Sequence, residues 1–301
     1  MKRNKGIYNQ QQRSDTISAW LFLAPTLILF AAFVVFPVLF SAFLSFTSWD
    51  VISGISSIKF IGLKNFRDMF QDREFIYALR NTFIYTITIV PISIVLSLGI
   101  AYMLNNKIYL KKTTRLMFFV PYISNAVALA TVFKALFRSD GPINNVLANM
   151  GIQNLPQWFS DPNLAKIPII ILVIWTSIGY HMVVYMAALQ DVPRDLYEAA
   201  AIDGAKPVKQ FLKITVPLVS PTTFYLTIVR TIAVFKLFTS VKIMTGATSE
   251  RTSTTLVLEI YHAAFGNYEF GYASAMSWIL FAIILAVTLF QMWGQKKWVH
   301  Y

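Results

Sequence analysis

Six long apolar segments restrict the fold of this chain more than any other feature of its sequence. Each holds roughly the 20 mostly apolar residues that a helix needs to cross a bilayer. Because lipid offers the backbone no hydrogen-bond partners, spanning segments are helices or closed barrels, and segments of this length favour helices. Only 13% of the residues are charged, against about 25% in soluble domains. We therefore predict an all-α integral membrane protein with six transmembrane helices, at residues 17–46, 82–104, 116–137, 167–189, 219–239 and 272–293.

The distribution of Lys and Arg predicts how these helices are oriented. An even number of spans puts both chain ends on one side of the membrane, together with the connections after the second and fourth spans. These segments carry an excess of Lys and Arg over Asp and Glu, whereas the opposite loops are nearly balanced. Cytoplasmic segments concentrate positive charge. We therefore expect both termini in the cytoplasm, and we expect the net charge of +12 to reflect membrane orientation and not nucleic-acid binding.

The domain organisation follows from these spans. The first apolar segment is too long for the apolar part of a signal peptide, roughly 7–15 residues, so we expect it to be kept as a span. The predicted parts are a cytoplasmic tail (1–16), the first transmembrane helix with an external loop (17–81), a five-helix core (82–293) that contains a cytoplasmic loop (190–218), and a second cytoplasmic tail (294–301).

The predicted spans lack the side chains of a self-powered transporter or an enzyme. None contains Asp or Glu, which proton- and sodium-coupled carriers usually need within the bilayer. The sequence has no Cys, no G-x-x-x-x-G-K-[ST] loop for ATP phosphates and no H-E-x-x-H metal pattern. Its three His are scattered, and we expect His181 in the fourth span to be satisfied by packing. We therefore predict no catalytic residue, metal site or cofactor in this chain, and uphill transport would need a partner as its energy source.

The loop between the fourth and fifth spans has the pattern of a helical hairpin. Pro193 suits the first turn of a helix, and Asp195 and Glu198 suit its positive end. Gly204 can adopt the left-handed conformation that ends a helix, and Pro207 suits the start of another. We predict a helix–glycine–helix hairpin that projects into the cytoplasm. The alternative is an amphipathic hairpin on lipid headgroups, which would account for the lysines of this loop.

This loop resembles the EAA loop of permease subunits in binding-protein-dependent type I ABC importers. The pattern E-A-A-x-x-D-G-A followed by F-x-x-I-x-x-P occurs at Glu198, Ala199, Ala200, Asp203, Gly204, Ala205, Phe211, Ile214 and Pro217. The resemblance implies that the loop docks on a cytoplasmic ATPase, with Glu198 making a polar contact and Gly204 providing the turn. It also implies the partners: two ATPase subunits that would bind ATP and Mg²⁺, an extracytoplasmic solute-binding protein, and a second, paralogous permease subunit.

Further segments resemble the carbohydrate-uptake branch of these permeases, in particular its maltose-permease-F-like and glycerol-phosphate-permease-A-like members. They are the proline-containing first span (20–50), an external F-x-G-L-x-N-F motif (60–70), an external G-x-x-N helix (140–151) and the region after the fifth span (235–265). One departure lies at Gly246-Ala247-Thr248, where the family often has Gly-Gly-Pro. The resemblance implies a multi-pass permease of the cell membrane that passes a sugar or oligosaccharide by alternating access.

Other functions stay open at this point. The same machinery could carry glycerol phosphate or another polyol or anionic sugar. A channel or secondary carrier that works alone belongs to a different class, which the carboxylate-free spans disfavour. A membrane enzyme is disfavoured by the lack of paired acids, a nucleophile or a metal set.

Four residues of the fourth and fifth spans are candidates for contact with the solute. Trp175, Tyr180 and Tyr185 could stack on a sugar, although packing or an interfacial aromatic belt explains them more simply. Trp175 and Tyr185 would lie about 80° apart around a helix. Arg230 lies near the middle of the fifth span, where a charge costs about 2.5–3.5 kcal/mol. It either faces the pore and helps a polyhydroxylated or anionic solute to pass, or bonds to backbone carbonyls of a neighbouring helix.

Overall fold

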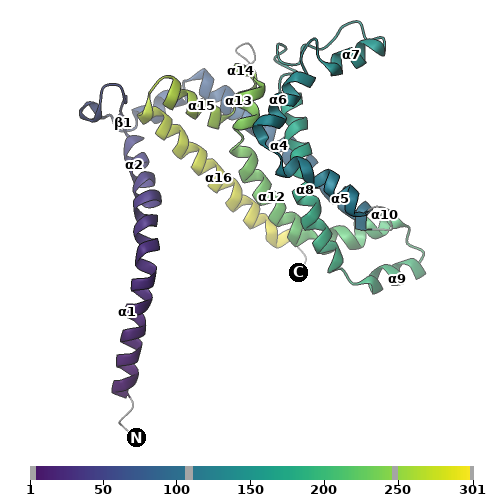
Figure 1. Cartoon of the computed structure of the whole chain (residues 1–301), viewed down its shortest axis with the longest axis horizontal. Helices are drawn as coiled ribbons and strands as arrows, with labels where there is room; N and C mark the ends of the chain where they lie inside the picture. The colour runs from purple at the N-terminus through teal and green to yellow at the C-terminus, as the bar shows by residue number, and fades with distance from the viewer. Residues whose placement is uncertain (1–4, 106–110, 246–249, 299–301) are drawn as a thin grey trace.

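The computed structural model describes residues 5–105, 111–245 and 250–298, and its regular structure is almost entirely helical (Figure 1). A short antiparallel β-hairpin (β1, Thr47–Ser48; β2, Lys59–Phe60) follows the first span. The α-helices are α1 (Lys5–Phe30), α2 (Phe36–Leu44), α3 (Lys64–Met69), α4 (Arg73–Asn105), α5 (Lys111–Ile123), α6 (Ala126–Leu136), α7 (Pro142–Asn149), α8 (Ile167–Gln190), α9 (Arg194–Ile202), α10 (Pro207–Gln210), α11 (Val216–Leu218), α12 (Ser220–Phe235), α13 (Thr239–Met244), α14 (Glu250–Ser253), α15 (Leu256–Tyr261) and α16 (Phe270–Trp298).

Four stretches are long and apolar enough to cross a membrane as continuous helices. They are Asp15–Leu44, which joins α1 to α2, Arg73–Asn105 (α4), Lys166–Gln190 (α8) and Phe270–Gln295 (α16). Two further pairs qualify as bent spans: Thr113–Ile123 with Ala126–Leu136, bent by 97°, and Pro207–Leu218 with Ser220–Phe235, bent by 68°. Six spans result if each bent pair counts as one, so the prediction of an all-α membrane protein is confirmed.

The third span differs from its prediction, because residues 116–137 do not form one continuous helix. The chain breaks at Asn125, whose backbone is extended (φ −62°, ψ 122°) and whose side chain caps α6. Its Oδ1 accepts hydrogen bonds from the backbone N–H groups of Val127 (2.8 Å) and Ala128 (3.2 Å). Such a cap replaces the backbone partners that a helix start lacks. Pro121 lies inside α5 and does not cause the break.

A glycine lets the first half of this bent span lie directly on α8. A Cβ atom at Gly179 would clash with the backbone of Phe118 and Phe119 in α5. The backbones of α5 and α8 therefore approach closely at this position, as small residues allow in membrane helix packing.

Two groups of buried side chains hold the helices together. The larger surrounds α4 and α8 and includes Tyr85, Ile89, Leu172, Met182 and Leu226. The smaller joins α3, α15 and α16 to the start of α4 through residues such as Met69, Phe75, Leu256 and Met276. Helix α12 contacts α4, α8 and α16, so it links the two groups.

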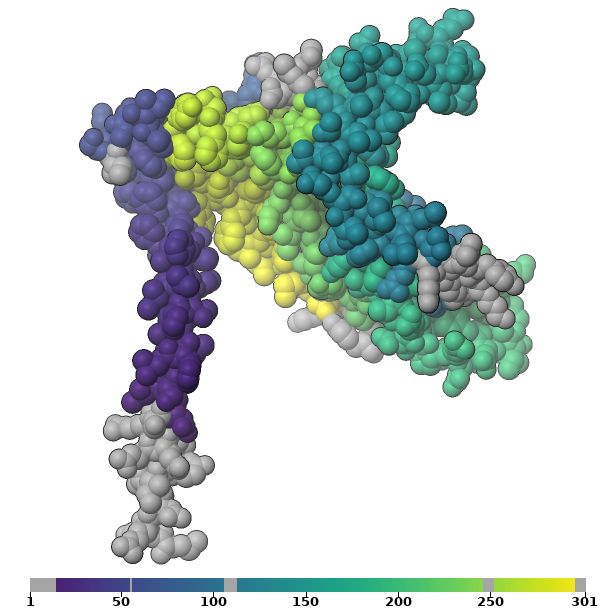
Figure 2. Space-filling view, viewed as in Figure 1, coloured from purple at the N-terminus to yellow at the C-terminus, as the bar shows by residue number. Residues whose placement is uncertain are grey.

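The first span stands away from this core. Only 6% of its apolar window is buried in the chain, compared with 56% for the span formed by α8. Figure 2 shows α1 as a column separated from the other helices along most of its length. It joins the core at α2, where the indole N–H of Trp278 in α16 donates to Ser41 Oγ (3.2 Å).

The two ends of the bundle carry different segments (Figure 1). The start of α1, the end of α16 and helix α9 lie toward one end. The β-hairpin, α7 and α14 lie toward the other. This is the arrangement that an even number of spans requires.

Candidate functional site: the hairpin and the intramembrane cavity

The connection between α8 and α12 folds as the predicted helix–glycine–helix hairpin, which we call the coupling hairpin (residues 194–218). Helix α9 follows Pro193, whose backbone is extended (ψ 129°). It ends at Asp203, and Gly204 then takes a φ of +75°. The backbone N–H of Ala205 donates to Ala200 O (2.8 Å), and that of Gly204 donates to Ala201 O (3.0 Å). This pair of bonds is the Schellman motif that a left-handed residue makes possible, and it explains the D-G-A part of the sequence pattern.

Inward-facing side chains fasten the coupling hairpin to the core. The hydroxyls of Tyr197 and Thr215 lie 2.8 Å apart, and Thr215 is fully buried. The rings of Phe211 and Tyr102 on α4 have centroids 4.7 Å apart. Ile214 packs against the same buried cluster. The aromatic and aliphatic positions of the motif are therefore anchors, and movement of the hairpin would reach α4 and α12.

The opposite face of the coupling hairpin is uncovered. Ile202 is 88% exposed and Val208 is 70% exposed, and Leu212 is also exposed. Glu198, Ala199, Asp203 and Gly204 are exposed as well, whereas Ala200, Ala205 and Pro217 are half-buried. Large aliphatic side chains grouped on a polar surface indicate a contact with a protein partner or a membrane.

A cavity of about 420 Å³ lies inside the span region, within the range of roughly 300–1,000 Å³ that is usual for ligand pockets. It opens where the break between α5 and α6 faces α8, α12 and α13. Its walls are Pro121, Tyr122, Ser124, Ala126, Leu129, Leu172, Thr176, Ser177, Tyr180, His181, Val229, Arg230, Ala233 and Ser240. The break at Asn125, which we did not predict, therefore helps to form this space.

Arg230 bonds to a backbone carbonyl of a neighbouring helix, as one of the two predictions has it, and it also lines the cavity. One of its terminal nitrogens, Nη2, donates to the backbone carbonyl of Val173 on α8 (2.7 Å). The guanidinium also lines the cavity, and its buried Nε has no hydrogen-bond partner among the described residues. The bond to α8 thus holds the charge at the cavity wall.

The three predicted aromatic residues lie in different surroundings. Tyr180 lines the cavity and stacks on Tyr122, with ring centroids 5.3 Å apart. Trp175 is 37% exposed and stacks on Phe133, and it is not part of the cavity wall. Tyr185 is fully buried, and its hydroxyl donates to Thr223 Oγ1 (3.0 Å). Of the three, only Tyr180 is brought to the cavity.

The sequence reasoning missed several cavity residues, and His181 is the most informative. Its side chain is only 3% exposed and lines the cavity. We expected packing to satisfy it, but its buried Nδ1 has no hydrogen-bond partner among the described residues. The sequence did carry a signal for this residue. His181 follows Ser177 by about one helical turn, so the two polar side chains lie on the same face of α8.

The F-x-G-L-x-N-F motif, which we predicted to be external, has a structural explanation. Gly62 takes a φ of +62° and turns the chain after β2. The buried side-chain amide of Asn65 donates to Ser45 O (2.9 Å) and Thr47 O (2.8 Å). The motif therefore ties α3 to the end of the first span.

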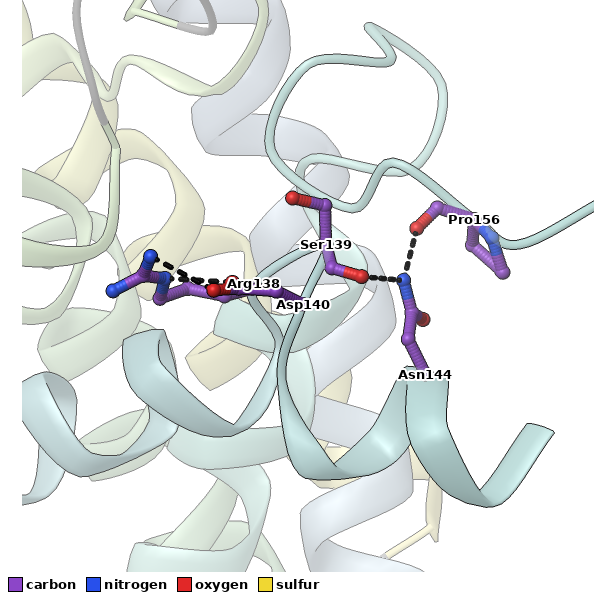
Figure 3. A network of polar contacts seen from close by, with 5 residues as sticks. All are labelled: Arg138, Ser139, Asp140, Asn144 and Pro156. Carbon is purple, nitrogen blue, oxygen red and sulfur yellow. Dashed lines mark hydrogen bonds and ion pairs between the residues drawn. The ribbon is translucent and has the colours of Figure 1, made fainter. Parts of the chain in front are cut away.

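The G-x-x-N motif, also predicted to be external, likewise holds a loop through a buried Asn (Figure 3). The buried side-chain amide of Asn144 on α7 donates to Ser139 O (3.0 Å) and Pro156 O (2.9 Å), and its oxygen accepts from Trp158 Nε1 (2.8 Å). A Cβ atom at Gly141 would lie 2.7 Å from two backbone oxygens of α6. Gly141 thus allows the loop to approach α6, and Asn144 joins the parts of the loop to one another.

Sequence comparison places this architecture among transport permeases. The family described as binding-protein-dependent transport system inner membrane component matches residues 93–299. The chain is 35% identical to a probable ABC transporter permease protein, YesP, of Bacillus subtilis (strain 168), over 100% of this chain and 96% of the relative. It is 36% identical to the lactose transport system permease protein LacF of Rhizobium radiobacter, over 95% of this chain and 96% of the relative.

Structure comparison agrees on the fold. A crystal structure of a bacterial ABC transporter involved in the import of the acidic polysaccharide alginate contains a similar chain, with a TM-score of 0.80 at 23% identity over 97% of this chain and 99% of that one. The resemblance stated above is therefore confirmed at the level of the family. The chain belongs to the family of binding-protein-dependent transport system inner membrane components.

Proposed function

We propose that this chain is one of two permease subunits of an ATP-driven importer and that it passes a sugar or oligosaccharide by alternating access. The observation that carries the proposal is the link between an uncovered hairpin and an internal cavity. The coupling hairpin is exposed at Ile202 and anchored through Phe211 to Tyr102 on α4. It continues into α12 through Thr215, whose backbone carbonyl accepts from the N–H of Val219 at the start of that helix. Helix α12 carries Arg230 to the cavity.

An ATPase partner suits the exposed face of the coupling hairpin. Ile202, Val208 and Leu212 offer apolar area, and Glu198 and Asp203 offer polar groups at its edge. Protein interfaces commonly combine such an apolar centre with a polar rim. ATP and Mg²⁺ would bind in that partner, and this hairpin would face the cytoplasm together with both termini.

A sugar suits the cavity. Its wall joins the stacked rings of Tyr122 and Tyr180 with the hydroxyls of Ser124, Thr176 and Ser177. Relatives support this class, because they include permeases named for transport of lactose, of multiple sugars and of sn-glycerol-3-phosphate. The last of these keeps glycerol phosphate as an alternative solute for the same machinery.

A second permease subunit and a solute-binding protein complete the proposed assembly. The apolar face of α1 is uncovered and would be shared between lipid and the paralogous subunit. On the opposite side, the loops held by Asn65 and Asn144 would receive the binding protein. One structural neighbour was crystallised with an alginate pentasaccharide-bound periplasmic protein.

Crosslinking in native membranes tests the proposal. A photoreactive residue at position 202 should capture a nucleotide-binding subunit, whereas one at the similarly exposed Ile52 in the β1–β2 loop should not. Capture of lipid alone at position 202 would favour the headgroup alternative. Uptake by the purified chain without an ATPase would show instead that the protein is an autonomous carrier.

A further inference from the structure

The cavity has one charged side chain and no opposite charge. The helices that line it, α5, α6, α8, α12 and α13, contain no Asp or Glu. Arg230 is the one charged residue of the wall, and among the described residues it makes no ion pair. Arg230 is half-buried, and a charge that is partly withdrawn from water without an opposite charge is costly.

Three hydroxyl groups of the wall are placed to accept hydrogen bonds from a solute. The hydroxyls of Ser124, Thr176 and Ser177 donate to backbone carbonyls within their own helices, at 2.7 Å, 3.0 Å and 2.7 Å. Their hydrogens are therefore engaged, and their oxygens keep lone pairs for donors from a solute. The wall thus offers hydrogen-bond acceptors at several points and unengaged donors at Arg230.

A second buried group without a partner lies in the same wall. The side chain of His181 is only 3% exposed, and its Nδ1 lacks a hydrogen bond among the described residues. An imidazole nitrogen either donates or accepts, depending on its tautomer. Both Arg230 and His181 line the cavity, and each has one buried nitrogen without a hydrogen-bond partner among the described residues. Native structures leave few buried polar groups unsatisfied, so such a pair marks this wall as unusual.

We infer that the solute is an anionic sugar and that its acidic group binds at Arg230, with His181 as a second hydrogen-bonding group. This inference rests on the proposed function, in which the cavity lies on the solute path. A carboxylate or phosphate supplies the missing negative charge and accepts charge-assisted hydrogen bonds from the guanidinium. A neutral sugar supplies acceptors but leaves the charge of Arg230 uncompensated. The remaining hydroxyls of the sugar donate to the oxygens of Ser124, Thr176 and Ser177.

Direct binding to the assembled importer tests the inference. The full complex in nanodiscs, without its solute-binding protein, is titrated with trigalacturonate, with the same trisaccharide after reduction of its carboxyl groups, and with glycerol 3-phosphate. We expect at least one of the two anions to bind about tenfold more tightly than the neutral trisaccharide, as for one charge-assisted hydrogen bond. The two anions distinguish a carboxylate from a phosphate.

Variants locate the effect in the cavity. Arg230→Gln should remove the preference for the anion, so that the anionic and the neutral trisaccharide bind with about the same affinity. Lys236→Gln changes a basic residue at the end of the same helix that is not part of the wall, and should leave the preference intact. His181→Phe should weaken binding of the anion, and His181→Asn, which keeps a polar atom near the position of Nδ1, should restore part of it.

The failures of the two proposals are distinguishable. Equal binding of the neutral and anionic trisaccharides, with ATP-driven uptake intact, overturns the inference and leaves the importer function standing. If a carboxylate of the second permease neutralises Arg230, the two trisaccharides should also bind equally, and the inference is likewise wrong. If Arg230→Gln does not assemble, Arg230→Lys keeps the charge and must keep the preference for the anion; its loss in that variant contradicts the inference.

Discussion

The hydroxyl groups of Tyr197 and Thr215 lie 2.8 Å apart and join the two helical arms of the coupling hairpin at its base. Tyr197 comes from α9, whereas Thr215 ends the π-helical turn Phe211–Thr215 that leads into α11. Thr215 is fully buried, so this contact lies where the hairpin enters the core. A force applied at Gly204 would therefore move both arms together.

Removing this contact should weaken coupling more than assembly. Tyr197→Phe keeps the ring and deletes the hydroxyl, a loss of about 0.5–1.5 kcal/mol for one hydrogen bond. We expect fewer solute molecules transported per ATP hydrolysed in proteoliposomes, with the subunits still associated. Tyr102→Phe is the matched control, because it keeps the ring that packs on Phe211. An unchanged transport ratio in Tyr197→Phe would show that the contact does not transmit force.

Gly204 and Gly54 form a natural pair for testing the hairpin turn. Their φ angles are +75° and +77°, and a Cβ atom at either would meet no atom within 4 Å. Substitution by Val strains the backbone equally at both, since β-branched residues resist positive φ. We expect Gly204→Val to abolish ATPase association and Gly54→Val, in the β1–β2 loop, to preserve it. Co-purification of the ATPase measures both, and equal loss in the two variants would mean that strain alone is responsible.

The coupling hairpin was predictable because its signals are local. Gly204 follows a run of helix formers, and the anchors Phe211 and Ile214 are spaced by three residues on one helical face. The spans were predictable for a similar reason, because length and hydropathy suffice to identify a membrane helix. These parts of the fold do not depend on which helices are neighbours.

The cavity was not predictable in this way. Tyr180 and Tyr185 lie on the same apolar helix, and only packing decides that Tyr180 faces the cavity while Tyr185 is buried beside Thr223. Asn125 did offer a signal, since Asn is a preferred cap at the start of a helix. The apolar residues on both sides hid it, because hydropathy averages over a single polar position.

Gly179 should be difficult to replace, because α5 and α8 approach closely at this position. A Cβ atom there would clash with the backbone of Phe118 and Phe119, which cannot move aside as a flexible side chain can. We expect Gly179→Ala to lower stability by about 1–3 kcal/mol, the usual cost of overpacking, and to lower the melting temperature in detergent. Gly99→Ala in α4 has open space around the new methyl group and should have no such effect. A wild-type melting temperature for Gly179→Ala would show that α5 and α8 are not in close contact.

Substitutions of Asn144 and of its neighbour Asn145 test the role of the G-x-x-N motif. Each removes one amide, but only Asn144 belongs to the motif. Asn144→Ala leaves Ser139 O, Pro156 O and Trp158 Nε1 without their partner, and each unsatisfied buried group costs about 1–3 kcal/mol. Asn145 is exposed, so Asn145→Ala should be nearly neutral. We expect faster hydrogen exchange over residues 139–158 in Asn144→Ala alone. Its transport should also need a higher concentration of binding protein, because the loop that would receive this protein is no longer held in its conformation by Asn144. Faster exchange with an unchanged requirement for binding protein would mean that the motif stabilises the loop without shaping a docking surface.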